Sequence, residues 1–238
     1  MFAELEGKEQ TLFELLTAIP PDWAAMEQFL REGKLTSQEI TKAATYYVDE
    51  CFCEARDAEI EAGISRSAGI VPDLHSTYLC DAVKLLLPFG LDPNGIFNDG
   101  DSNIMDSLRY VDNEFLAADA LALLLEHGGD PTLYIPGANE PLFCYVSDDV
   151  FSEADEMDDR KQYASLVHFW MVLIGYGARY NTNSAKMMFF KEYHSSRLFD
   201  PDKLRNHRNY YFGISHLEGR TTVHIYDKET LWEVARLT

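Results

Sequence analysis

The chain has no long apolar run and few cysteines, and both shortages narrow the classes of protein to which it can belong. No apolar stretch reaches the roughly 18 to 20 residues that a membrane-spanning helix needs. The N-terminal MFAELEGKEQ is acidic and lacks the basic and apolar segments of a secretory signal. The cysteines form no CxxC pair and have no histidine at zinc-finger spacing; they are Cys51, Cys53, Cys80 and Cys144. We therefore expect a cytoplasmic protein with reduced, mostly buried thiols.

Basic residues are scarce as well. The chain has 20 lysines and arginines against 40 acidic residues, which gives a net charge of −20. Such a surface repels a phosphate backbone, so we do not expect direct nucleic-acid binding. Two interpretations of the charge stay open: it keeps a bacterial-type cytoplasmic protein soluble, or it complements a basic partner. Composition alone favours the first.

Catalytic and cofactor motifs are also missing. The chain contains no GxSxG, HExxH, Walker A or GxGxxG motif, and its seven histidines show no ligand spacing. In NDGDSN (98–103), Asp99, Asp101 and Asn103 alternate like calcium ligands. However, Ile104 and Tyr110 stand where a calcium loop needs glycine and glutamate. We therefore expect no metal, no cofactor and no catalytic residue.

What the chain does have is a repeated pattern in which a leucine-rich segment ends at a glycine. The glycines are Gly33, Gly90, Gly128 and Gly177; 38 residues separate the second from the third, and 49 separate the third from the fourth. These loose periods are typical of a solenoid with uneven loops. The 57 residues between Gly33 and Gly90 leave room for a divergent unit or an insertion.

The segment before Gly128 shows how one unit is built. In ADALALLLEHGG the apolar residues fall at helical spacing, Gly128 can close the helix in the left-handed conformation, and Pro131 prevents it from resuming. Upstream, NIMDSLRYV (103–111) predicts a short helix with Asn103 as its N-cap. The same pattern places His127 at the helix C-terminus.

These segments resemble the ankyrin repeat. LLLEHGGDPT (123–132) and LLLPFGLDPN (85–94) are similar to the end of its second helix, EPLFCYV (140–146) to the start of its first, and GARYN (177–181) keeps part of the following turn. The resemblance covers about residues 72–181. It departs from the family where Phe143 replaces the usual histidine and where the intervals are too long.

The resemblance implies protein recognition through protruding loops between the units. In the first loop the candidate contact residues are Ile96, Phe97, Asp99 and Asp101, and in the second they are Leu133, Tyr134, Ile135 and Asn139. A third candidate is the acidic run DDVFSEADEMDD (148–159). It is either a solvated loop or an anionic patch that would use Asp148, Asp149, Glu153 and Asp155.

The two ends of the chain differ from the middle. Residues 1–71 predict a helical cap, with helices at 11–19 and 22–33 and a longer one from Ser37, and residues 72–194 hold the ankyrin-like repeats and a helix at 187–193. Residues 195–238 predict a three-stranded antiparallel meander with strands at 210–216, 221–226 and 231–237, although the last segment also fits a helix capped by Asp227. His216 and His224 flank the hairpin and are placed to face each other across it.

Taken together, the sequence predicts a mostly α protein: an ankyrin-like helical-hairpin solenoid with a small C-terminal antiparallel β meander. We expect a monomeric, non-enzymatic module that binds another protein and neither nucleic acid nor a membrane. A narrower hypothesis is an immunity-type inhibitor that sequesters a basic toxin. The alternatives are an enzyme with its site between the repeats and the C-terminal sheet, and a self-associating structural protein.

Overall fold

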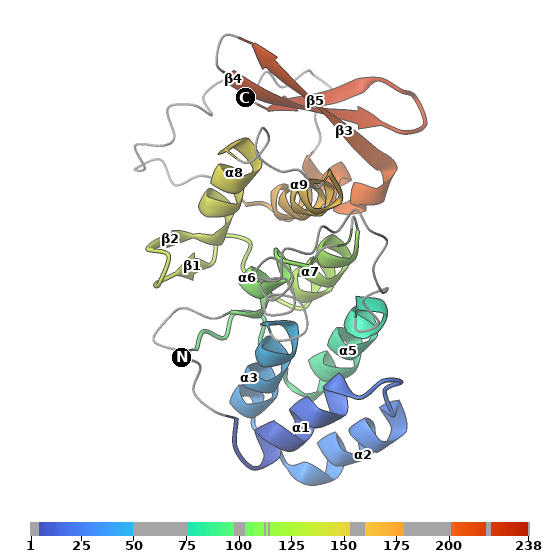
Figure 1. The fold of residues 1–238 in the computed structure, drawn as a ribbon, viewed down its shortest axis with the longest axis vertical. Coiled ribbons are helices and arrows are strands. Elements are labelled where there is room, and N and C mark those ends of the chain that lie inside the picture. Colours follow the sequence, from blue (N-terminus) through green and yellow to red (C-terminus); the bar gives the residue numbers. More distant parts are fainter. Residues whose placement is uncertain are drawn as a thin grey trace, which may run out of the picture.

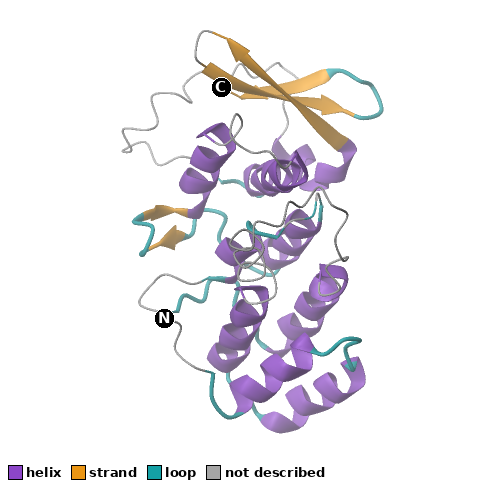
Figure 2. Ribbon diagram, viewed as in Figure 1, coloured by secondary structure: helices purple, strands orange, loops and turns teal. Residues whose placement is uncertain are grey.

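The computed structural model is mostly helical and carries a small antiparallel sheet at its C-terminal end (Figures 1 and 2). It describes residues 5–49, 76–97, 103–111, 113, 115–152, 160–178, 201–217 and 220–237. In this part of the chain the α-helices are α1 (Lys8–Thr17), α2 (Trp23–Gly33), α3 (Ser37–Val48), α5 (Leu79–Leu86), α6 (Ile104–Leu108), α7 (Leu116–Glu126), α8 (Leu142–Ser152) and α9 (Arg160–Gly175). The 3₁₀ segments are η3 (Ser76–Tyr78), η4 (Leu87–Phe89) and η8 (Pro201–Asn209). The strands are β1 (Tyr134–Ile135), β2 (Glu140–Pro141), β3 (Tyr210–Leu217), β4 (Arg220–Asp227) and β5 (Glu233–Leu237).

Helices α2 and α3 begin where the sequence predicts them to begin, whereas α1 begins at Lys8, three residues before the predicted start at residue 11. Asp22 caps α2, because its side chain accepts a hydrogen bond of 3.0 Å from the backbone N–H of Ala25. Helix α3 starts at Ser37 and is capped by the residue before it: Thr36 and Glu39 exchange side-chain and backbone hydrogen bonds in a capping box. None of the described helices is both long enough and apolar enough to cross a membrane.

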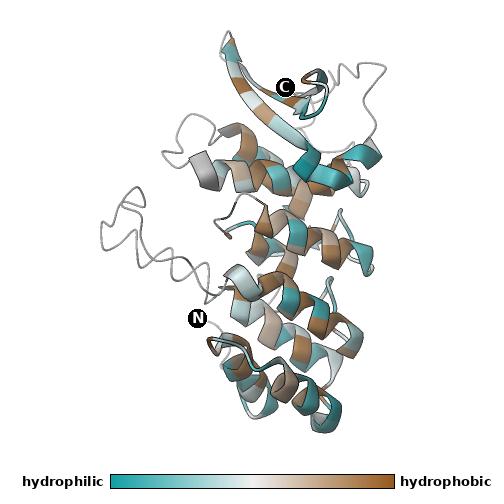
Figure 3. Ribbon diagram, turned by 90° about the vertical axis from the view of Figure 1, so that its right-hand side faces the viewer, coloured by the Kyte–Doolittle hydropathy of each residue, from teal (hydrophilic) through white to brown (hydrophobic). Residues whose placement is uncertain are grey.

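The helices follow one another along the long axis of the molecule (Figures 1 and 3). Helix α3 packs against α1 on one side and α6 on the other, and α7 lies between α5 and α9. The predicted apolar face of α7 is buried on these neighbours, since Ala117, Leu121 and Leu124 are all 0% exposed. A single continuous core therefore runs from α1 to the sheet.

Gly90, Gly128 and Gly177 end their helical segments in the same way. All three are left-handed, with φ of 106°, 95° and 99°. Each glycine N–H donates to the carbonyl three residues back, at 3.1, 3.2 and 3.0 Å, and the next N–H donates to the carbonyl five residues back, at 3.2, 3.0 and 2.9 Å. This pair of bonds is the Schellman motif, which satisfies carbonyls that the helix end leaves free. The prediction of a left-handed Gly128 is confirmed.

Gly33 does not share this conformation. It is the last residue of α2, and the left-handed position falls on Lys34, whose φ is 47°. The alignment of Gly33 with the later glycines is therefore wrong by one residue. A lysine at this position carries the strain of a left-handed Cβ, which glycine avoids.

The Asp-Pro pairs after two of these glycines shape the following turn. The carboxylates of Asp92 and Asp130 each accept a hydrogen bond from the backbone N–H two residues ahead, at 2.9 and 2.8 Å. These are Asx turns, in which a short acidic side chain imitates a backbone turn. The repeated Asp-Pro is thus explained by local structure.

Neighbouring turns are also joined to each other. Asn94, in the turn after Gly90, donates to the carbonyl of Gly128 at 2.9 Å and accepts from the backbone N–H of Asp130 at 2.7 Å. The turn after Gly90 is also joined to helix α3, because the N–H of Asp92 donates to the hydroxyl of Thr41 at 2.7 Å. These bonds hold successive turns at fixed positions along one side of the helices.

The C-terminal strands form an antiparallel sheet with the order β3-β4-β5. The prediction of a small antiparallel sheet at this end is confirmed, and the last segment is a strand and not the alternative helix. One face of the sheet covers α9, because Val223 and Ile225 are 0% exposed and the ring of Phe212 lies 5.8 Å from that of Tyr163.

Segment η8 connects the helices to this sheet and approaches α9 very closely at Gly175. A Cβ atom added to Gly175 would lie 2.6 Å from the backbone nitrogen of Arg205, so no side chain fits there. The guanidinium of Arg205 also donates to the carbonyl of Gly175, at 2.9 Å. The sequence analysis did not predict this contact.

Several expectations lie outside the described residues. These are the continuation of α3 through residues 50–63, the helix at 187–193, most of the GARYN turn, and Cys51 and Cys53. Both expected domain boundaries, after residues 71 and 194, fall there too. Of the other thiols, Cys80 and Cys144 are free cysteines.

Candidate functional site

The loop after Gly90 holds the first group of candidate contact residues. Ile96 and Phe97 are half-buried, and Asp99 and Asp101 lie outside the described residues. Asn103 is 0% exposed and caps α6: its carbonyl oxygen accepts from the N–H of Met105 at 2.8 Å. Its amide also donates to two backbone carbonyls of the preceding loop, at 3.0 and 2.7 Å. The predicted N-cap is therefore confirmed.

The second group lies on the short β1–β2 hairpin. Tyr134 is 47% exposed, and its hydroxyl donates to the side-chain oxygen of Asn139 at 2.7 Å. Asn139 is exposed at the turn with a left-handed φ of 55°. Leu133 is half-buried, and Ile135 is 1% exposed and packs into the core. The hairpin thus exposes Tyr134 and Asn139 as a hydrogen-bonded pair, and the buried side chain of Ile135 anchors the hairpin to the core.

The acidic candidates on α8 are partly engaged within the molecule. Arg109 places one guanidinium nitrogen 2.6 Å from Asp149 and another 2.9 Å from Asp106. The same guanidinium lies over the ring of Tyr110, 3.8 Å from its centroid. Asp148 is half-buried, and Glu153 and Asp155 lie outside the described residues. Part of the negative charge of Asp149 is therefore neutralised by Arg109.

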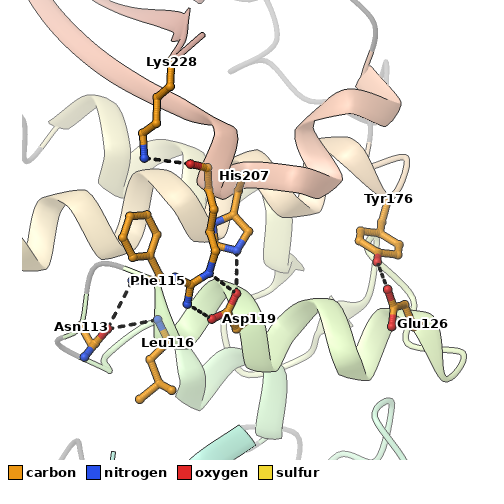
Figure 4. A network of polar contacts seen from close by, with 9 residues as sticks. Asn113, Phe115, Leu116, Asp119, Glu126, Tyr176, His207 and Lys228 are labelled. Carbon is orange, nitrogen blue, oxygen red and sulfur yellow. Dashed lines mark hydrogen bonds and ion pairs between the residues drawn. The ribbon is translucent and has the colours of Figure 1, made fainter.

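A cluster of polar and aromatic side chains lies where η8 meets α7 and α9; Figure 4 shows Phe115, Asp119 and His207 of this cluster. We call Phe115, Asp119, His168, His207 and Arg208 the junction cluster. Asp119 of α7 accepts hydrogen bonds from His207 at 3.0 Å and from Arg208 at 3.1 Å, both on η8. The imidazoles of His168 and His207 are 5.4 Å apart, and His168 also packs 4.9 Å from Phe115.

A lysine extends the junction cluster to the sheet. Lys228, just after β4, donates to the backbone carbonyl of Arg208 at 2.8 Å. Its ammonium group and the guanidinium of Arg208 lie over the ring of Phe115, at 5.1 and 4.6 Å from the centroid. Two cations thus share one aromatic ring, and this arrangement ties the sheet to α7.

Several titratable groups in this region have pKa values far from their ordinary ones. Burial alone raises the pKa of Asp119, but hydrogen bonds from His207 and Arg208 outweigh it and lower the pKa to about 2. Burial lowers the pKa of His168 to about 3, so this imidazole is neutral at physiological pH. Burial also raises the pKa of the nearby Cys80 thiol to about 11. A neutral thiol and a very weakly basic imidazole make a poor nucleophile and a poor proton acceptor.

No sequence spacing would have identified the junction cluster. Its members come from the start of α7, including Phe115 just before it, from α9 and from η8, and long stretches of chain separate these segments. The one local signal is Asp119, a charged residue within the otherwise apolar ADALALLL. Its partners become visible only when the fold brings η8 onto α7.

The two faces of the C-terminal sheet have different compositions. Phe212, opposite Ile225, belongs to the face that covers α9, and Tyr211, opposite Tyr226, belongs to the outward face. His216 pairs with Thr221 and His224 with Gly213, so the two histidines lie on opposite faces. The expectation that they face each other is therefore wrong, because strand neighbours alternate between faces and the pairing register offsets them.

Among the described residues, no group of three or more potential ligands is arranged to hold a metal ion. No protein-family model matches the chain, and neither a curated protein nor a solved structure matches it.

Proposed function

We propose that the helical part of the chain is a degenerate ankyrin-like solenoid that recognises another protein and does not act as an enzyme. The support comes from the turns: Gly90, Gly128 and Gly177 have the same hydrogen-bond pattern, and Asn94 joins one turn to the next. Stacked units of this kind form a rigid scaffold whose loops are free to vary. The repetition of one turn geometry is the observation that carries the proposal.

The exposed hairpin is the best candidate for the contact surface. Tyr134 combines an exposed ring with a hydroxyl held by Asn139, so little side-chain freedom is lost when a partner covers it. Tyrosines of this kind often contribute a large share of binding energy. The net charge of −20 favours a basic partner, such as a toxin that an immunity-type inhibitor sequesters.

The alternative of an enzyme is supported by one specific observation. The junction cluster brings Asp119, His168 and His207 together where the alternative places its site, and the buried Nδ1 of His207 has no hydrogen-bond partner among the described residues. Against it, Asp119 is engaged by two cationic or hydrogen-bonding partners and His168 is neutral. A structural role in holding the sheet on the helices explains these side chains better than a catalytic role does.

The test measures capture of a partner by the whole chain and by two matched tyrosine variants. Immobilised protein is incubated with native lysate, and the bound proteins are identified and their affinities measured with purified material. Tyr134→Ser should weaken the specific complex roughly thirtyfold, the size of an aromatic hot spot of about 2 kcal/mol. Tyr211→Ser, on the outward face of the sheet and 39% exposed, is the control and should leave affinity unchanged.

Salt tests the narrower hypothesis separately. Raising the ionic strength screens exposed charges, so a basic partner should bind much more weakly at high salt. Binding that ignores salt would remove the electrostatic argument and leave the recognition proposal standing. A complex that survives Tyr134→Ser at full affinity, or the absence of any specific complex, would count against recognition through the hairpin.

A further inference from the structure

The outward face of the C-terminal sheet aligns three polar side chains, one from each strand. The hydroxyl oxygen of Ser215 on β3 lies 2.7 Å from Nε2 of His224 on β4. Nδ1 of the same imidazole lies 2.8 Å from a carboxylate oxygen of Glu233 on β5. A hydroxyl, an imidazole and a carboxylate are therefore joined in a single row across the sheet.

The contact with Glu233 determines which ring nitrogen of His224 carries a proton. A carboxylate only accepts hydrogen bonds, so Nδ1 of His224 carries the proton that Glu233 receives. In the neutral form of the imidazole, Nε2 presents its lone pair to the hydroxyl of Ser215, which donates to it. A nucleophile next to a base, with the base oriented by a third group, is the arrangement that activates serine in acyl transfer.

A β-bulge is responsible for the position of Glu233. The register between β4 and β5 shifts between Ile225, which pairs with Ala235, and Tyr226, which pairs with Glu233. If this sequence paired regularly past Ile225, Val234 would stand opposite Tyr226, and Glu233 would point to the opposite face. Bulges re-aim side chains in this way next to functional sites.

The imidazole of His224 has a glycine and aromatic rings as its neighbours on this face. Gly213 is its direct cross-strand partner, and a Cβ atom added to Gly213 would lie 3.5 Å from the ring of Tyr226. The ring of Tyr226 lies nearly parallel to His224 at 6.2 Å and stacks on Tyr211 at 5.0 Å. His224 keeps 16% of its side chain exposed while Ser215 is exposed, so dissolved compounds can reach the hydroxyl.

We propose that Ser215 is a nucleophile that takes the acyl group of a small carboxylic ester. Its oxygen attacks the carbonyl carbon while the hydroxyl proton moves to Nε2 of His224. When the carbon–oxygen bond to the leaving group breaks, that proton passes to the departing alkoxide, which leaves as an alcohol. Water then attacks the acyl-serine and gives a proton to His224, which returns it to the serine oxygen as the carboxylic acid is released.

The surroundings of Ser215 favour an unhindered ester with a short apolar acyl group. Tyr211 and Leu217 lie on the same face of β3, and they are 39% and 74% exposed. Within the described sheet β3 is an edge strand, so alternate N–H groups along it point away from β4. The proposal assigns to these N–H groups the role of donors to the oxyanion that forms during attack.

This inference goes beyond the proposed recognition function, because it concerns the sheet and not the helical units. Its first test is labelling of the full chain with a short-chain alkyl fluorophosphonate, which phosphonylates activated serines. Mass spectrometry should locate the label on Ser215, and Ser215→Ala should abolish it. His224→Gln should slow labelling on the order of a hundredfold, the lower end of what a general base contributes.

His216→Gln is the matched control, since it changes a histidine of the same hairpin on the opposite face. Its labelling rate should equal that of the unchanged chain. A parallel measurement follows hydrolysis of p-nitrophenyl butyrate above the spontaneous rate, which should respond to the variants in the same order. Absence of label on Ser215, or equal labelling of the His224→Gln variant and the unchanged chain, would overturn the proposal.

Glu233 is a positioning residue and needs a test that separates orientation from stability. Glu233→Gln should slow labelling by at least about tenfold, because the amide no longer favours the required tautomer of His224. Glu233→Asp keeps the carboxylate and should restore part of the rate, while both variants unfold at similar urea concentrations. Equal labelling by the Gln and Asp variants would mean that Glu233 does not orient the imidazole.

Discussion

The helical part and the C-terminal sheet keep their places by different means. Along the helices, burial is mostly apolar and the glycine turns repeat one geometry. The sheet packs on α9 through apolar Val223 and Ile225, and it is also attached through η8, the close approach at Gly175 and the polar junction cluster. Of the exposed large apolar residues in the described chain, Ile19 and Tyr134 belong to the helical part, and the sheet region holds Tyr211, Leu217, Leu231 and Trp232. The helices are thus held mainly by apolar burial and repeated turns, whereas the sheet combines apolar burial with a few specific polar and close contacts.

The largest loss of folding stability should come from replacing Trp170, which is buried, whereas Trp232 in the sheet region is exposed. Trp170 of α9 is 0% exposed, and its indole N–H donates to the hydroxyl of Ser147 at 2.9 Å. Trp170→Ala should lower the free energy of unfolding by about 3 to 5 kcal/mol, because it leaves a large cavity. Urea unfolding followed by circular dichroism measures the change.

Trp232→Ala is the counterpart in the sheet region. This side chain is 69% exposed, so its removal should change the free energy of unfolding by less than about 0.5 kcal/mol. Similar losses for the two variants would contradict the difference in burial on which the comparison rests.

The junction between the two regions should be broken by a single methyl group. Gly175→Ala places a Cβ atom 2.6 Å from the backbone nitrogen of Arg205, and backbone atoms cannot move aside easily. We expect a loss of about 2 to 3 kcal/mol despite the better helix propensity of alanine. Hydrogen exchange should quicken in residues 201–237 and stay unchanged in α1, α2 and α3.

Gly128→Ala is the matched substitution inside the helical part. No atom lies within 4 Å of the added Cβ, so the cost comes only from the left-handed φ of 95° and should be about 1 kcal/mol. If Gly175→Ala were the milder of the two, close packing of η8 on α9 would not be what holds the sheet.

A smaller effect should appear as a pH dependence at the junction. The unfolded chain takes up a proton at His168 near pH 6.5, whereas the folded pKa of about 3 keeps the buried imidazole neutral. Because the unfolded state binds the proton first, stability should fall as the pH drops below 6.5, by about 2 kcal/mol at pH 5. The groups around the imidazole are Asp119, His207, Arg208 and Lys228.

The control variant removes the titrating imidazole of His168, and the comparison is between the slopes of unfolding free energy against pH. His168→Gln should show a flatter dependence of unfolding free energy on pH between 6.5 and 5. Asp119 does not interfere, because its stabilising charge is lost only as the pH falls towards its pKa of about 2. An unchanged slope would place the acid sensitivity elsewhere in the chain.

Local signals made part of this fold predictable. Gly128 and Asn103 were recognisable because a helix end needs a left-handed residue or a capping oxygen, and few residue types supply either. The C-terminal strands were recognisable by their β-branched and aromatic residues, as in TTVHIY (221–226). In each case the interacting atoms lie within a few positions along the chain.

The rest depends on distances that no local pattern encodes. Asp119 meets His207 only after η8 folds back onto α7. His216 and His224 were misplaced because facing depends on the register of pairing, which a single position shifts. Glu233 reaches His224 only through the bulge, and nothing in LWEVARL marks Val234 as the additional residue.

The bulge at Val234 also determines how the row of side chains responds to a change in the length of β5. Loss of this one codon would restore regular pairing and leave Glu233 opposite Tyr226, on the same face as His224. The three side chains would therefore stay in line in a gene one codon shorter, and the length of this strand alone does not decide whether the row is present.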